Sequence, residues 1–232
     1  MKSLKFGLVL FFVVLMGFFW PRPGWTAEGP DYLVGEKYIG FSIGYVMPES
    51  IEIHDDSAID YRSVSLDDGL MNGLRMGWRP FENLAYELEY NYITGIEAPG
   101  QLIYSEPGID FYFEQGEVNI HALFFNFILR NPPAFRGVTP YMGFGVGIAG
   151  VQFRNVRFEI NLAGESFISP EMSESDTEIA GQLLAGCEFD IDEHWTGTVG
   201  YKFLYVSPEF DDMGFDTIFR IHTLTAGLNY TF

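Results

Sequence analysis

The side chains best suited to chemistry in this sequence are charged and amide residues that recur at every second position of short segments. They are Arg75, Glu87, Glu89, Gln182, Glu188 and Lys202. A spacing of two places side chains on one face of a β-strand. Buried charges must find partners, so we expect these residues to form an interior network of ion pairs and hydrogen bonds. We predict no catalytic residue, cofactor or metal site among them.

Turn positions suggest which side chains meet. A turn centred on Phe81 places Arg75 opposite Glu87, with Glu89 diagonal to it. A turn centred on Asp192 likewise places Gln182 opposite Lys202. Inward charges would then be paired, and the interior would be plugged instead of forming an open pore. The alternative is that these charges lie at strand ends in water.

A third turn, centred on Ala134, places Phe125 opposite Gly143. The inward row of that segment then becomes unusually apolar; it comprises Asn119, His121, Leu123, Phe125 and Phe127. Asn72 and Asn126 fall in the outward, otherwise apolar row, where amides are out of place.

The sequence gives little indication of a catalytic site. A lipid-acting hydrolase needs a histidine beside a hydroxyl or carboxylate. His222 is the candidate, with Asp216 or Glu209 nearby and Ser207 as the nearest serine. We interpret His222 as an interface residue. The single cysteine, Cys187, cannot form an internal disulfide, and no metal-ligand spacing of Cys and His occurs.

Composition narrows the function classes. Hydrophobic residues make up 47% of the chain and aromatic residues 17%, too much for a disordered chain. The formal net charge of −19 argues against a nucleic-acid partner, because phosphate binding needs basic patches. It also argues against a polybasic membrane-surface protein.

The first 27 residues have the pattern of a signal peptide. Lys2 and Lys5 precede an apolar run over 6–20, which Pro21 ends. This run is shorter than the roughly 20 residues that a spanning helix needs. We predict cleavage after Ala27 and a mature domain over 28–232, the alternative being a retained anchor.

Beyond this point the period is two residues nearly everywhere, which predicts an all-β fold. The expected strands are Tyr38–Met47, Leu70–Trp78, Leu84–Ile93, Val118–Leu129, Pro140–Val151, Ile179–Phe189, Trp195–Tyr205 and Ile218–Phe232. Three short connections alternate with four long ones, which span 48–67, 94–117, 152–178 and 206–217. This sorting predicts an eight-stranded antiparallel up-and-down transmembrane β-barrel, with short periplasmic turns and four long extracellular loops.

The two rows of side chains on these strands differ in kind. One row is apolar and carries no charge, as a lipid-facing surface requires; the other is polar and rich in glycine. A soluble lipocalin-like barrel would reverse the two rows. Glycine favours a polar interior, because the lumen of an eight-stranded barrel is barely wide enough for side chains. Burial of Phe41, Leu88, Val146 and Leu228 would overturn this orientation. Aromatic girdles are expected at both ends, with Trp78 and Trp195 at the short-turn end and Tyr45 and Phe219 at the other.

The chain resembles the small outer-membrane β-barrel superfamily that includes the OmpA transmembrane domain, OmpX and the neisserial opacity proteins. The matching stretches are 73–90, 140–147 and 224–232. The closing pattern, with Tyr230 and the terminal Phe232, resembles the signal read by the barrel-assembly machinery, which the resemblance implies as a partner. It also implies localisation in the outer membrane of a Gram-negative cell after export.

We therefore predict a non-enzymatic surface or structural protein that contacts outer-membrane lipid, including lipopolysaccharide, and a possible ligand through its loops. The first and last long loops are acidic; their carboxylates are Glu49, Glu52, Asp55, Asp56, Asp60, Asp67, Asp68, Glu209, Asp211, Asp212 and Asp216. The alternatives are a lipid A-modifying enzyme of the deacylase type and a narrow solute pore.

Overall fold

The computed structural model of the chain describes residues 35–51, 63–131, 137–162, 165–210 and 215–232. The predicted signal peptide over 1–27 lies outside this range. The strands are β1 (Glu36–Pro48), β2 (Gly69–Phe81), β3 (Leu84–Ala98), β4 (Gln101–Glu106), β5 (Ile109–Arg130), β6 (Val138–Leu162), β7 (Glu165–Ile168), β8 (Met172–Asp190), β9 (Trp195–Val206), β10 (Glu209–Phe210), β11 (Phe215–Asp216) and β12 (Phe219–Thr231). Among the described residues, no helix is both long and apolar enough to cross a membrane.

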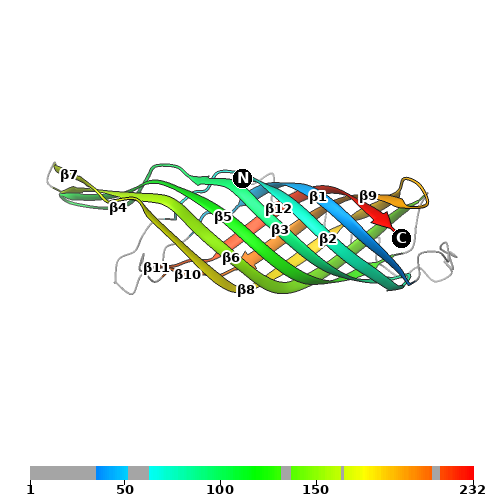
Figure 1. The fold of residues 1–232 in the computed structure, drawn as a ribbon. Coiled ribbons are helices and arrows are strands. Elements are labelled where there is room, and N and C mark those ends of the chain that lie inside the picture. Colours follow the sequence, from blue (N-terminus) through cyan, green and yellow to red (C-terminus); the bar gives the residue numbers. More distant parts are fainter. Residues whose placement is uncertain (1–34, 52–62, 132–136, 163–164, 211–214) are drawn as a thin grey trace.

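Eight of these strands close into an antiparallel barrel, which confirms the predicted fold class (Figure 1). Around the ring the order is β5, β3, β2, β1, β12, β9, β8 and β6, and β6 pairs again with β5. Each expected strand segment lies within or overlaps one of these eight strands. First and last strands meet, because Tyr38 of β1 pairs with Thr231 of β12.

Two strands are much longer than a membrane crossing requires. β5 has 22 residues and β6 has 25, whereas a tilted spanning strand needs about 9–11. Beyond the barrel wall the start of β5 and the end of β6 remain paired, with β4 hydrogen-bonded to β5 and β7 to β6. These four strands form a sheet that projects from one end of the barrel; we call it the projecting sheet (Figure 1). The expected loops over 94–117 and 152–178 are therefore largely β-structure.

The apolar row faces outward. Phe41, Leu88, Val146 and Leu228 are 48%, 42%, 56% and 48% exposed, respectively. The Arg75 and Glu87 side chains are 7% and 6% exposed. The soluble-carrier alternative is thus wrong, and the uncharged surface is the one that would contact lipid. Trp78, Trp195 and Tyr45 lie outside, as expected for girdles.

The prediction that Phe219 belongs to an outer aromatic girdle is wrong, because its side chain is fully buried. It belongs to an apolar core that fills the half of the barrel nearest the projecting sheet. The largest side chains of that core are Phe113, Phe124, Phe153 and Phe219. The interior therefore has two layers, one apolar at the end with long connections and one polar towards the short turns.

Candidate functional site

The centre of the polar layer is a set of hydrogen bonds around Glu89 on β3. Lys202 on β9 donates to its Oε1, and Gln182 on β8 donates to its Oε2 at 3.0 Å. Asn126 on β5 donates through Nδ2 to both Glu89 at 3.1 Å and Glu87 at 3.0 Å. The Asn126 carbonyl in turn accepts from Gln182 at 2.6 Å. Every polar atom of the Asn126 side chain is therefore satisfied, as a buried amide requires.

Arg75 on β2 extends this set towards the first and last strands. Its Nε donates to Asn229 Oδ1 at 2.7 Å, and its Nη2 donates to Thr198 Oγ1 at 2.9 Å. Glu87 is 3.9 Å from the same Nε. The guanidinium fits because Gly40 leaves space: a Cβ there would lie 2.7 Å from Arg75 Nε. Glycine in this row thus makes room for the network, as the sequence pattern suggested.

A second ionic group lies nearer the short turns, around Glu188 on β8. Arg130 on β5 donates to Glu188 Oε2 through Nε at 2.9 Å and Nη2 at 2.5 Å. Arg79 Nη2 is 3.8 Å from the same oxygen. Arg79 also lies over the ring of Tyr38, with its Cζ 4.6 Å from the ring centroid, and Tyr38 donates to Glu87 at 2.9 Å. Tyr38 consequently links the two ionic groups.

All six residues expected in the interior network lie inside, but two expected pairings are wrong. Arg75 is opposite Glu89 instead of Glu87, because Glu82 and Asn83 form the turn, later than the expected centre at Phe81, and a bulge lies between Trp78 and Phe81. Lys202 is opposite Leu184, while Gln182 is opposite Leu204. Both shifts amount to two residues, so each side chain stays on its expected face.

The expected register across the turn after β5 is also wrong. This error has a larger consequence, because the observed register differs from the expected one by an odd number of residues. Phe125 pairs with Val146 and not with Gly143. An odd shift turns every side chain to the opposite face, so Leu123 and Phe125 are exposed and the true inward residues are Ile120, Ala122, Phe124, Asn126, Ile128 and Arg130. Asn126, which looked misplaced among apolar residues, was the signal that could have revealed this; Asn72 does lie on the outside.

His222 forms a separate polar group near the end of the barrel with long connections. Its Nδ1 is 2.5 Å from the Tyr201 hydroxyl, and its Nε2 is 3.1 Å from Glu49 Oε1. Ser207, the serine considered in the sequence, instead donates to the carbonyl of Thr217 at 3.4 Å. The side chains of Glu209 and Asp216 lie outside the described residues. Within the described part of the chain, no group of three or more His, Cys, Asp or Glu side chains could hold a metal ion.

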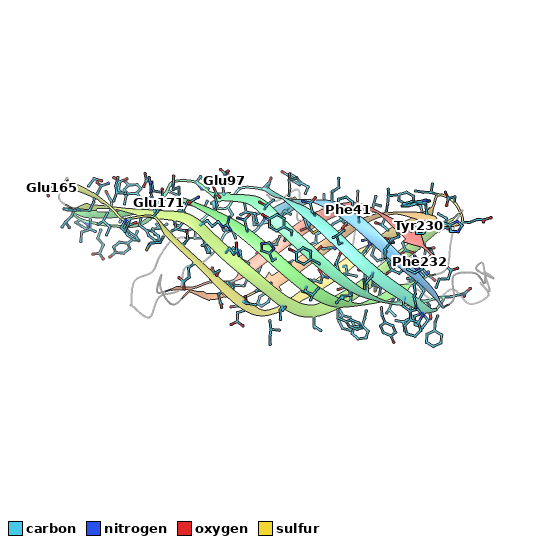
Figure 2. The ribbon with its side chains drawn as sticks, viewed as in Figure 1. Phe41, Glu97, Glu165, Glu171, Tyr230 and Phe232 are labelled. Carbon is cyan, nitrogen blue, oxygen red and sulfur yellow. The ribbon has the colours of Figure 1, made fainter. Side chains whose placement is uncertain are left out.

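The short turn between β8 and β9 is held by Asp192. One carboxylate oxygen, Oδ1, accepts from the backbone N–H of His194 at 2.8 Å and of Trp195 at 2.9 Å. These two bonds favour the ionised form and lower the pKa of Asp192 below its usual 3.8. Tyr230 and Phe232 lie at this end of the barrel, exposed on its outer surface (Figure 2).

The projecting sheet lies at the opposite end and presents two different faces. Glu165 of β7 marks its far end, distant from Tyr230 and Phe232 (Figure 2). On one face, Phe111 stacks on Phe158 with ring centroids 5.4 Å apart. The acidic residues predicted in the first long loop at 52, 55, 56 and 60 lie outside the described residues, as do those at 211 and 212.

Comparison with known proteins agrees with this architecture. The family model "Outer membrane protein beta-barrel domain" matches residues 26–232. Neisserial surface protein A has 17% sequence identity and a TM-score of 0.50, and the match covers 84% of this chain and 97% of that one. OprG of Pseudomonas aeruginosa has 13% identity and a TM-score of 0.51, with 86% and 96% covered. At these identities the likeness concerns the fold alone. No curated protein sequence matches the chain significantly.

Proposed function

Because this chain belongs to the outer membrane protein β-barrel domain family, we propose that it is a non-enzymatic outer-membrane barrel with a closed interior, which acts through its projecting sheet. The sheet then lies outside the cell and the short turns lie in the periplasm. Export with a cleaved signal peptide, insertion by the barrel-assembly machinery through Tyr230 and Phe232, and contact with lipopolysaccharide are parts of this proposal.

The observation that carries the proposal is the two-layered interior. In the polar layer, Glu87 and Glu89 are buried and bonded to partners on other strands. In the apolar layer, Phe153 and Phe219 are buried with ring centroids 5.9 Å apart. A pathway for ions would have to break both layers. This arrangement favours a structural barrel over the alternative of a narrow solute pore.

Planar-bilayer recording tests the closed interior. We expect the purified barrel to give no resolvable single-channel conductance, with a known porin in the same bilayers as the positive control. Steady conductance that scales with salt concentration would show that the pore interpretation is the right one.

A second experiment tests the surface role. In the variant for this experiment, short turns replace residues 99–116 and 154–173. This change removes the projecting sheet and keeps the barrel wall. Cells that express this variant should lose the adhesion or autoaggregation conferred by the complete chain, while heat-modifiable mobility in gels shows that the barrel still folds. Unchanged adhesion with a folded barrel would count against a role for the sheet.

A lipid-acting enzyme is the second candidate, because His222 lies between a carboxylate and a hydroxyl. A carboxylate, an imidazole and a hydroxyl that are hydrogen-bonded in this order can activate the hydroxyl oxygen as a nucleophile. However, the Tyr201 side chain is only 3% exposed, which restricts access to an acyl ester. The mass spectrum of lipid A distinguishes the two candidates: an enzyme would change it, and His222→Ala would abolish the change. His194→Ala, in the short turn, is the matched control.

A further inference from the structure

The projecting sheet has one face built from large apolar side chains. Ile109 pairs with Leu162, Phe111 pairs with Ile160, and Ile160 pairs with Phe167. Directly opposed residues of antiparallel strands project to the same side. These five residues therefore share one side, which we call the apolar sheet face.

This face is open to solvent beyond the barrel. Ile109, Ile160, Leu162 and Phe167 are 38%, 41%, 48% and 55% exposed, respectively. The opposite side of the same strands is mostly polar: it carries Asp110, Glu159, Asn161 and Ser166, and its large exposed apolar side chain is Ile168 of β7. A solvated sheet has no need of an apolar side, and contiguous exposed apolar surface commonly marks an interaction site.

Carboxylates flank the apolar sheet face on both edges. Glu106 of β4 is opposite Ile109, and Glu165 of β7 is opposite Leu162, so both share its side; both are exposed. The wider surroundings are also acidic: residues 97–117 contain five acidic and no basic residues, and residues 152–178 contain six acidic and two basic ones. One of those two, Arg157, is already paired with Glu171.

We propose that the apolar sheet face binds a cationic amphipathic peptide segment of another protein. Its apolar side chains would cover Ile160, Leu162 and Phe167, and its lysines or arginines would meet Glu106 and Glu165. Charge selects this partner: a second copy of the chain, with a net charge of −19, and the anionic headgroups of lipopolysaccharide would both be repelled. This inference rests on the proposed function, because it requires the sheet to lie outside the cell.

The test uses the complete barrel in phosphatidylcholine nanodiscs and two fluorescent peptides, one alternating lysine with valine and the other alternating glutamate with valine. Fluorescence anisotropy should show binding of the lysine peptide only, weakened by added salt. Phe167→Ser should weaken this binding about tenfold, as loss of a large apolar anchor does. Ile168→Ser is the matched control, because Ile168 is the next residue, is 60% exposed and lies on the opposite face. Empty nanodiscs control for binding to lipid.

Three results would overturn the proposal: equal binding of both peptides, no binding of the lysine peptide, or equal effects of Phe167→Ser and Ile168→Ser. The double variant Glu106→Gln/Glu165→Gln keeps the sheet and should reduce binding of the lysine peptide and its salt dependence together. None of these measurements depends on conductance or on adhesion. A barrel that is closed and adhesive but fails to bind the lysine peptide would therefore refute the inference alone.

Discussion

Lys202 and Glu89 form an ion pair across the barrel lumen. Lys202 lies on β9 and Glu89 on β3, and these strands are opposite one another in the ring of eight. The two residues are 113 positions apart in the sequence. The pair therefore links two walls that no backbone hydrogen bond joins, and it fixes their separation in the polar layer.

Replacing one partner should be more harmful than replacing both. Lys202→Met leaves Glu89 buried without its cation, and we expect the free energy of unfolding to fall by about 3–5 kcal/mol. The double variant Lys202→Met/Glu89→Gln removes both charges and should recover much of this loss. Urea titration in phosphatidylcholine vesicles, followed by tryptophan fluorescence, measures both values. Equal destabilisation by the single and double variants would contradict the cross-lumen ion pair.

Asn126 and Asn72 offer a matched pair on opposite faces of the wall. Asn126→Leu removes the amide that donates to Glu87 and Glu89. Hydrogen bonds to charged groups contribute about 1.5–3 kcal/mol each, so we expect a clear loss of stability. Asn72 is exposed on the lipid side, and Asn72→Leu should be neutral or stabilising. Similar effects of the two variants in the same urea titration would contradict the assigned faces.

The two-residue periodicity of the sequence was sufficient to predict the eight strands and the face on which most side chains lie, because alternate residues of a strand point to opposite faces. It was insufficient for register. The turns before β3 and β9 lie later than expected, which shifted the partners of Arg75 and Lys202 by two positions and left their faces unchanged. The odd error after β5 instead turned Phe125 to the wrong face. Pairing across the lumen, as between Lys202 and Glu89, depends on the closed ring and has no local signal.

The projecting sheet was also missed, for a different reason. Apolar alternation does continue over Ile109–Phe113 and Phe158–Leu162, which is the pattern of a strand. The strands expected from the sequence end before this alternation, and Pro107 and Gly108 interrupt it with a turn between β4 and β5. The two faces of the sheet became visible only with the pairing of β5, β6 and β7.

The hydrogen bonds of Asp192 in the turn between β8 and β9 predict that part of the barrel's stability is lost as the pH falls. The folded pKa of Asp192 lies below its usual 3.8, because two backbone N–H groups donate to its carboxylate. Its contribution to stability is thus present above the unfolded pKa and is lost as the pH falls through the folded pKa. Asp192→Ala should have a lower urea midpoint than the wild type at neutral pH, and the difference should shrink in acid. A difference that stays constant with pH would show that the carboxylate charge has no part in the turn.

Glycine in the inward row predicts a test of packing in the polar layer. A Cβ at Gly77 would overlap the ring of Tyr38, which cannot move without losing its bond to Glu87. Overpacking of this kind costs about 1–3 kcal/mol, so Gly77→Ala should lower the urea midpoint.

Gly181 is the matched control, because nothing lies within 4 Å of a Cβ built there. Gly181→Ala should be neutral or slightly stabilising, since alanine has less conformational freedom to lose on folding than glycine. The comparison separates crowding of the lumen from the general effect of removing a strand glycine. If both variants shift the midpoint by the same amount, the inward glycines do not make room for Tyr38 and its ionic neighbours, and their number in this row needs another cause.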